Sequence, residues 1–448
     1  MAFFPQTRRS KLLPSTAALG GAALGFAALA LAALGCTQAA GAGVNGTPTA
    51  VWEFTVVPVG TPAPTPTSTP VPTSISNEPD VDLDPGFELA GSLSQGRWGL
   101  TVTVLDDGTV IAVGGQERRS FSRNAPIEAE LLAAGSNDWL KTEPMQYERS
   151  FHTVTKLPDG RLLVAGGSGR EVLTEEEAQD RPFRGRQDLS SVEVFDVKTG
   201  EWSEVAEMQT RRQSGGAVLL GDGTVLVIGG SSGVAVEAKA EFYVPDEDAW
   251  VEIAPMSQAR KFHTVTQMVD GRVLVAGGQT RETALASTEI YDPSDGTWTT
   301  VANLVRPRSG HTASLLRDGR VMVVGGSDLG ATNVLGPETS AEIYDPVADE
   351  WTVIYGDLRP RLGHAAVTLP DGRVVVVGGE DLVGLSIDAV EVYQPATDTW
   401  KIAGSLPDGR SLLAATLLPD GSVLIVGGGT ASGFVSFPDY VLRFRVPK

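Results

Sequence analysis

The chain has 448 residues, and its 42% hydrophobic content is sufficient for a sizeable packed core. Its 35 Lys and Arg residues stand against 55 Asp and Glu residues. The resulting formal net charge of -20 has the wrong sign for a surface that follows nucleic-acid phosphates. The single cysteine excludes an internal disulfide framework and any zinc or iron–sulfur site built from several thiolates. We therefore expect a folded protein without a nucleic-acid partner.

Residues 1–36 have the pattern of a secretory leader. Three basic residues near the start are followed by an uncharged Ala, Leu and Gly run over about 16–34. The only cysteine, Cys36, directly follows this run and resembles the lipidated cysteine of a bacterial lipobox. Alternatively, the apolar run remains uncleaved as a membrane anchor. Both alternatives predict that the rest of the chain is extracytoplasmic and anchored to the cell membrane.

Residues 37–84 are dominated by Pro, Thr, Ser, Gly and Val. Such a stretch buries too little apolar area to offset its ordering entropy, and its prolines favour an extended backbone. We expect a disordered linker that holds a folded domain, residues 85–448, away from the membrane.

One unit recurs seven times in the folded part. Each copy has an Asp-Gly pair, then a short apolar run, then a Gly-Gly pair. The seven copies run from Asp107 to Gly115, Asp159 to Gly167, Asp222 to Gly230, Asp270 to Gly278, Asp318 to Gly326, Asp371 to Gly379 and Asp420 to Gly428. Asp-Gly between two apolar runs predicts a β-hairpin, and a run that is apolar at every position predicts a strand buried on both faces.

A second spacing accompanies the hairpins. Six units carry a Glu followed nine residues later by a Trp, and an Arg stands ten residues after each Trp. The Glu/Trp pairs are Glu130/Trp139, Glu193/Trp202, Glu241/Trp250, Glu289/Trp298, Glu342/Trp351 and Glu391/Trp400. The seven arginines are Arg97, Arg149, Arg212, Arg260, Arg308, Arg361 and Arg410. Their spacing of 48 to 63 residues predicts four short strands per unit, as in a β-propeller blade.

The ends of the repeat array predict how the ring closes. Phe87 stands ten residues before Arg97, where the other units have Trp. The N-terminal segment should therefore supply the outer strand of the blade that the C-terminus builds, which removes a free sheet edge. We expect an all-β, seven-bladed propeller closed by an N-terminal strand and preceded by the leader and the linker.

The Gly-Gly pairs, Glu-x-Tyr-Asp-Pro, the spaced Trp and Arg-x-x-His-Thr resemble the Kelch repeat of bacterial galactose-oxidase-like propellers, over about residues 87–446. Relatives of galactose oxidase hold copper with Tyr and His, and a Cys–Tyr crosslink supplies the redox partner. Cys36 precedes the linker, so that crosslinked site cannot be built here. We expect no metal and no other cofactor.

Alternating strand direction predicts that the seven arginines and the loops after the Gly-Gly pairs share one face. A ring of arginines near a central channel would attract carboxylates, acidic peptides or acidic sugars. Alternatively, each Arg is paired with a repeat Glu and has a purely structural role, with Leu442 in the place of the missing seventh Glu. Four histidines share a position three residues after a ring arginine, which predicts a structural role in separate blades. They are His152, His263, His311 and His364.

The loops after the Gly-Gly pairs vary in length and chemistry, as ligand-binding loops do on a rigid scaffold. The longest spans 168–190, and others span 116–126, 327–340 and 429–439. The leading hypothesis is a tethered module that binds a protein, peptide or glycan through the arginine face. The alternative is a carbohydrate-active enzyme, such as an epimerase, hydrolase or oxidase-like protein, with its site in the central channel. An unpaired carboxylate among the arginines would favour the enzyme, and Arg–Glu pairs would favour the binding module.

Overall fold

The computed structural model describes residues 83–116, 128–173, 185–233, 235–328, 340–381, 383–430 and 437–447. All of the described residues belong to the second of the two units into which the chain divides, residues 72–448. The expected leader, Cys36 and nearly all of the linker lie outside the described residues. No helix within the described ranges is long and apolar enough to cross a membrane.

The described residues of the second unit form seven four-stranded antiparallel sheets, here called blades 1 to 7. Each blade is given from its innermost strand outward. Blade 1 contains β2 (Thr101–Val104), β3 (Val110–Val113), β4 (Glu128–Leu132) and β5 (Trp139–Pro144). Blade 2 contains β7 (Thr153–Lys156), β8 (Leu162–Ala165), β11 (Val192–Asp196) and β12 (Glu201–Val205). Blade 3 contains β13 (Gly216–Leu219), β14 (Val225–Ile228), β15 (Ala240–Val244) and β16 (Ala249–Ile253).

The remaining blades follow the same order. Blade 4 contains β17 (Thr264–Gln267), β18 (Val273–Ala276), β19 (Thr288–Asp292) and β20 (Thr297–Val301). Blade 5 contains β21 (Thr312–Leu315), β22 (Val321–Val324), β23 (Ala341–Asp345) and β24 (Glu350–Ile354). Blade 6 contains β25 (Ala365–Thr368), β26 (Val374–Val377), β27 (Ala389–Gln394) and β28 (Thr399–Ser405). Blade 7 contains β29 (Ala414–Leu417), β30 (Val423–Val426), β31 (Tyr440–Phe444) and β1 (Phe87–Ser92).

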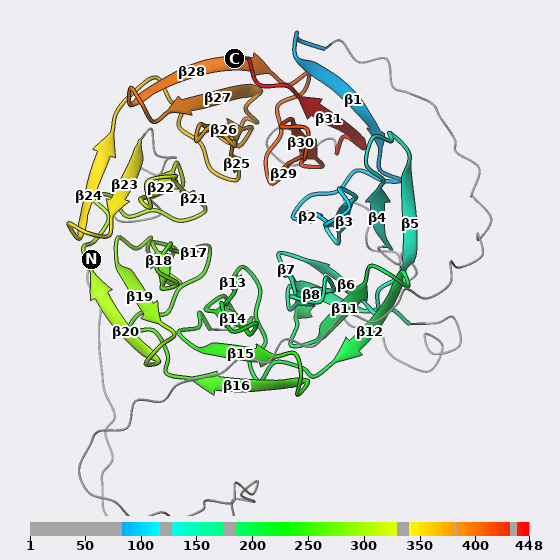
Figure 1. The fold of residues 1–448 in the computed structure, drawn as a ribbon, viewed down its shortest axis with the longest axis vertical. Coiled ribbons are helices and arrows are strands. Elements are labelled where there is room, and N and C mark those ends of the chain that lie inside the picture. Colours follow the sequence, from blue (N-terminus) through cyan, green and yellow to red (C-terminus); the bar gives the residue numbers. More distant parts are fainter. Residues whose placement is uncertain are drawn as a thin grey trace, which may run out of the picture. The chain divides into compact units, whose positions relative to one another are not determined.

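The blades stand around a common axis with their first strands innermost (Figure 1). Each innermost strand contacts those of both neighbouring blades, including β29 against β2, so the ring is closed. The second strand of every blade is buried at all four positions. The prediction of an all-β propeller is confirmed.

Blade 7 combines both ends of the folded part. Phe87 of β1 lies opposite Phe444 of β31 in an antiparallel pair, and their rings stack with centroids 4.5 Å apart. Figure 1 shows β1, from the N-terminal side, as the outermost strand beside β31. Phe87 therefore occupies the place of the missing tryptophan, as the spacing predicts.

The hydrophobic core lies between neighbouring blades. In blades 2 to 6 the aromatic residue of the third strand faces the Trp of the fourth strand in register, as Tyr243 faces Trp250. The ring of Tyr243 packs into a cluster with residues of the preceding blade, such as Leu163. Trp250 also donates its indole N–H to the carbonyl of Ala206, 2.7 Å away in the connection from that blade. The repeat aromatics therefore join adjacent blades.

An additional three-stranded sheet accompanies blade 2. It contains β6 (Tyr147–Ser150), β9 (Ser168–Glu171) and β10 (Gln187–Asp188). The spacing of the repeats does not predict this sheet, because β9 and β10 belong to the long insertion after Gly167. Within it, Glu148 is buried and bonds Arg170 Nε at 2.9 Å and Arg186 Nη1 at 3.1 Å. The part of this insertion that can be described is therefore anchored by buried charge pairs.

Candidate binding face at the channel mouth

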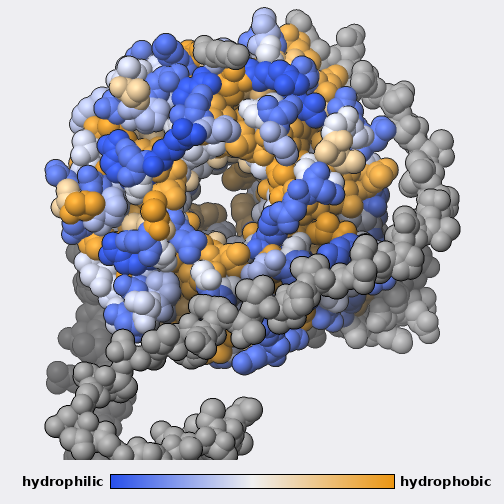
Figure 2. Space-filling view, in the orientation of Figure 1, coloured by the Kyte–Doolittle hydropathy of each residue, from blue (hydrophilic) through white to orange (hydrophobic). Residues whose placement is uncertain are grey.

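The arginines and the Gly-Gly pairs share the face at which the innermost strands begin. Each arginine precedes an innermost strand, and each Gly-Gly pair follows the second strand, which runs in the opposite direction. The ring is hollow at its centre (Figure 2). The opening of this central channel on the face that carries the arginines is called the channel mouth. The Asp-Gly turns lie on the opposite face.

Six of the seven arginines form buried ion pairs within their own blade. The pairs are Arg97/Glu130, Arg149/Glu193, Arg212/Glu241, Arg260/Glu289, Arg308/Glu342 and Arg361/Glu391. In four of them the N–O distance is 2.5 to 2.7 Å, and all twelve side chains are at most 4% exposed. Burial lowers the pKa of Arg361 to about 10, which leaves it charged at neutral pH.

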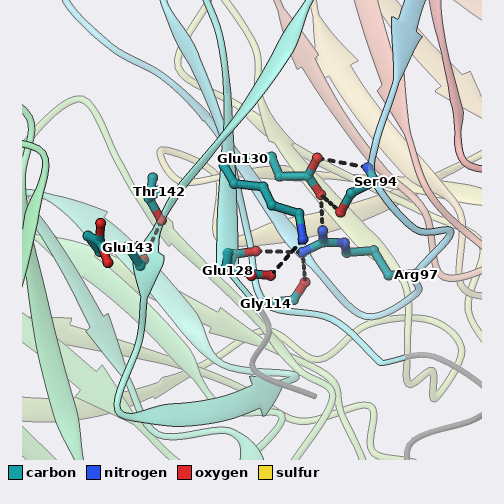
Figure 3. Close-up of polar contacts among 8 residues, drawn as sticks. Ser94, Arg97, Gly114, Glu128, Glu130, Thr142 and Glu143 are labelled. Carbon is teal, nitrogen blue, oxygen red and sulfur yellow. Dashed lines mark hydrogen bonds and ion pairs between the residues drawn. The ribbon is translucent and has the colours of Figure 1, made fainter. Parts of the chain in front are cut away.

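Each pair also satisfies backbone groups. In blade 1, Arg97 Nη1 donates to the carbonyls of Gly114 and Glu128 at 3.2 and 3.0 Å (Figure 3). Glu130 accepts the backbone N–H of Ser94 at 2.8 Å and its hydroxyl at 3.0 Å. The pair thus joins the segment entering the blade to the second and third strands. This geometry favours the structural role for these six arginines and gives no support to their role in ligand binding.

Arg410 in blade 7 has a different environment. Leu442 occupies the position of the glutamate, opposite Ile425 in the register. The Arg410 guanidinium instead lies 4.2 Å from the Tyr440 ring centroid, and its Nε and Nη2 have no hydrogen-bond partner among the described residues. Pro407 stands where five of the other blades supply a backbone N–H to the glutamate, so one of the groups that the carboxylate would satisfy is missing.

The residue two positions after each arginine lies at the channel mouth in the left-handed backbone conformation. The seven are Gly99, Phe151, Ser214, Phe262, Gly310, Gly363 and Leu412, with φ between 53° and 66°. Their backbones form a chain of hydrogen bonds around the ring. Among these, the N–H of Phe151 donates to the carbonyl of Gly99 at 3.0 Å, and the N–H of Gly99 donates to the carbonyl of Leu412 at 3.1 Å. The last of these bonds joins blade 1 to blade 7.

Three aromatic side chains gather at this mouth. The rings of Trp98 and Phe151 meet edge to face at 5.4 Å, and those of Phe151 and Phe262 at 6.4 Å. Phe262 is 38% exposed, and Lys261 Nζ lies 5.5 Å from its ring centroid. We call Trp98, Phe151 and Phe262 the aromatic cluster. The sequence interpretation missed it, although aromatic residues at a position occupied by Gly in other blades are a visible signal.

Two carboxylates lie in segments that follow Gly-Gly pairs. Asp188 is 3.5 Å from the hydroxyl of Ser231, and Glu380 is 3.4 Å from that of Ser411. Burial raises the pKa of both. They belong to blades 2 and 6, so they do not form the adjacent acid–base pair that glycoside hydrolysis requires.

Most residues of the four candidate binding loops lie outside the described ranges.

The histidines lie between blades, each beside the first glycine of a Gly-Gly pair in the preceding blade. The Nε2 atoms of His152, His311 and His364 are 2.9 to 3.1 Å from a threonine hydroxyl of the preceding innermost strand. All four are buried, in agreement with a structural role. Among the described residues, no group of three or more His, Cys, Asp or Glu side chains could hold a metal ion.

Residues 252–429 match the KLHDC2/KLHL20/DRC7 Kelch-repeats domain, and residues 157–209 match the Kelch motif. The chain is a Kelch-repeat β-propeller. Kelch repeats are typical of protein-interaction modules, and this coarser functional class agrees with the leading hypothesis.

Two relatives illustrate the similarity in sequence. Kelch-like protein 26 of Danio rerio is 30% identical over 169 residues, which cover 38% of this chain and 25% of the relative. Kelch repeat-containing protein kel-10 of Caenorhabditis elegans is 26% identical over 146 residues, covering 32% of this chain and 22% of the relative. The Kelch propeller therefore matches only about a quarter of the length of these relatives.

A solved structure shares the fold. It is a fungal alcohol oxidase of the AA5 family in complex with copper, with a TM-score of 0.64 and 18% sequence identity. The likeness covers 82% of this chain and 76% of the oxidase. At this identity the comparison shows the propeller fold alone.

Proposed function

We propose that this Kelch propeller binds a protein partner through the aromatic cluster at the channel mouth. The observation that carries the proposal is the backbone conformation of Phe151 and Phe262, with φ of 55° and 53°. A bulky residue in this region costs about 1–2 kcal/mol relative to glycine, which occupies the equivalent position in three other blades. Phe262 is exposed and Phe151 is half-buried, and residues kept at such a backbone cost cluster at ligand-binding sites.

The chemistry of the cluster suits an apolar side chain of a partner. Aromatic rings supply large contact areas with little conformational entropy to lose, and they are enriched at the centres of interfaces. Lys261 adds a cation over the ring of Phe262, which favours a partner segment carrying an acidic group beside its apolar anchor. A glycan is the other ligand class consistent with a surface of aromatic and polar side chains.

Selection from a displayed peptide library on the full chain, with a glycan array in parallel, tests this proposal. We expect selected peptides to bind the Phe151→Gly/Phe262→Gly variant at least tenfold more weakly, while its melting temperature is unchanged or higher. Val269→Ala is the matched control, because Val269 is 75% exposed beside an Asp-Gly turn on the opposite face. Equal binding by the double variant contradicts the proposal, and binding only on the glycan array assigns the face to carbohydrate.

We also propose that the propeller is displayed outside the cytoplasm. The basic start, the apolar run and Cys36 support lipid attachment, and the composition of residues 37–84 supports an extended spacer. Metabolic labelling with a palmitate analogue in a bacterial host should label the wild-type chain but not Cys36→Ser. If both proteins are unlabelled and remain in the membrane fraction, the uncleaved anchor is the correct alternative.

A further inference from the structure

Six of the seven contacts between neighbouring blades contain the same side-chain arrangement. In each, an apolar residue from the third strand of one blade packs in one cluster with an aromatic residue from the third strand of the next blade. The apolar residue is aliphatic in every contact except that of Phe242. The pairs are Leu131/Phe195, Val194/Tyr243, Phe242/Tyr291, Ile290/Tyr344, Ile343/Tyr393 and Val392/Phe444. This arrangement fills the space between blades near the Asp-Gly turns.

The seventh contact, between blades 7 and 1, differs at both positions. Leu132 faces Val110 and Trp139 in register, as Tyr243 faces Val225 and Trp250 in blade 3, so Leu132 replaces the aromatic residue. Its counterpart in blade 7 is Arg443, which faces Leu424 as Phe242 faces Leu226. One ring is missing at this contact, and a cationic side chain replaces the apolar one.

A cleft of about 190 Å³ lies at this contact, on the face opposite the channel mouth. Its lining residues include Val110, Leu132, Ala134, Leu418 and Arg443. A cavity of about 150 Å³ lined by aliphatic side chains accepts benzene, so this cleft is large enough for one aromatic ring and a small substituent. Its position and size match the side chain that the other contacts contain.

The polar end of the cleft is lined by Arg443 and by Asp420, which also pairs with Arg445. Arg443 Nε is buried and has no hydrogen-bond partner among the described residues. The neighbouring Asp420 already accepts hydrogen bonds from the backbone N–H and hydroxyl of Ser422 at 3.0 and 2.5 Å, and Arg445 Nη1 lies 3.4 Å from its Oδ2. The half-buried Arg443 can therefore take an additional acceptor at Nε, and a guanidinium pairs best with a carboxylate.

We propose that this cleft is a binding site for a small aromatic carboxylate. The ring replaces the missing side chain between Leu132 and Leu418, and the carboxylate accepts hydrogen bonds from Arg443. Both parts of the site are needed for selectivity. The aliphatic walls alone do not select an anion, and the guanidinium alone does not select an aromatic ring. The site is independent of the proposed function, since it lies on the other face of the propeller.

Calorimetric titration of the full chain with benzoate tests this inference. We expect saturable millimolar or tighter binding, at least tenfold weaker binding of benzyl alcohol, and no binding of acetate. Leu132→Tyr restores the ring found in the other blades, so it should weaken benzoate binding at least tenfold while the melting temperature stays equal or rises. Arg443→Leu restores the apolar residue and should also weaken benzoate binding at least tenfold.

Arg445→Leu is the matched control, because Arg445 lies on the same segment beside Asp420 but does not line the cleft. It should retain wild-type affinity for benzoate. Absence of benzoate binding to the wild-type chain overturns the inference. Unchanged affinity of Arg443→Leu for benzoate also overturns the inference, as do equal affinities of the wild type for benzoate and benzyl alcohol. These outcomes decide the question even if Leu132→Tyr does not fold.

Discussion

Replacing His263 by leucine is expected to stabilise the propeller, and to do so more strongly in acid. His263 is buried, and neither of its ring nitrogens makes a hydrogen bond of good geometry among the described residues, although the backbone of Arg260 and Ile228 lies near the ring. The other three histidines contact a threonine of the preceding blade, but Gly216 occupies that position here. Blades 1 and 7 carry Leu100 and Leu413 in the same register, so the repeat already accommodates leucine.

Two effects determine the magnitude. A buried polar group without a hydrogen bond costs about 1–3 kcal/mol at any pH. Burial, with the nearby charge of Arg260, lowers the pKa of His263 to about 3, whereas a histidine in an unfolded chain titrates near 6.5. At a pH between these two pKa values, the histidine is protonated in the unfolded chain but neutral in the folded protein. The wild type therefore loses about 1.4 kcal/mol of stability per pH unit below 6.5 through this residue. At pH 5 the advantage of His263→Leu grows by about 2 kcal/mol.

Urea denaturation of both proteins at pH 7.5 and pH 5 measures these effects. The raised pKa values of Asp188 and Glu380 change stability in the opposite direction, but they cancel in the difference between the proteins. His364→Leu is the control, because it gives up the contact with the Thr312 hydroxyl at 2.9 Å. The stability gained by His364→Leu at pH 7.5 should therefore be smaller than that gained by His263→Leu, and the gain should increase similarly as the pH falls. A loss of stability in His263→Leu at pH 7.5, or a difference independent of pH, would refute the reasoning.

Three other substitutions probe the ion pairs, the ring closure and the aromatic cluster by chemical denaturation. Glu342→Leu leaves the buried Arg308 guanidinium without its carboxylate and should cost about 3–5 kcal/mol; a loss below about 1 kcal/mol would contradict the structural role of the pair. Phe87→Ala removes the ring stacked on Phe444 and should cost about 3–5 kcal/mol, whereas an unchanged midpoint would mean that β1 does not complete blade 7. Phe262→Gly relieves left-handed strain at an exposed side chain and should leave stability unchanged or higher; a clear loss would place Phe262 in the core.

The blade architecture was predictable because its signals are local and repeated. An Asp-Gly turn between apolar runs specifies a hairpin whatever surrounds it, and seven copies at similar spacing specify a ring. Even the outer strand of blade 7 could be assigned, since Phe87 keeps the distance to Arg97 that Trp keeps in the other blades. The glutamate missing from this blade could also be placed, at Leu442.

The candidate sites depend on relations between segments far apart in the chain. The sequence showed Arg308 and Glu342 in fixed positions, but only their burial and the distance of 2.6 Å decide between an ion pair and a surface for ligands. The three-stranded sheet around Glu148 could likewise be recognised only from the folded structure, because two of its strands belong to the insertion after Gly167.

By itself, the sequence determined the blade pattern, the ring closure and the positions at which the repeat changes. Tertiary structure alone decided what those changes produce. Phe262 becomes a candidate binding residue only because its backbone is left-handed and its ring is exposed, and Leu132 and Arg443 line one cleft only because blade 7 meets blade 1. The physical reason is that burial and cavities arise from the side chains on both sides of a contact, and in a closed ring one such contact joins the two ends of the folded domain.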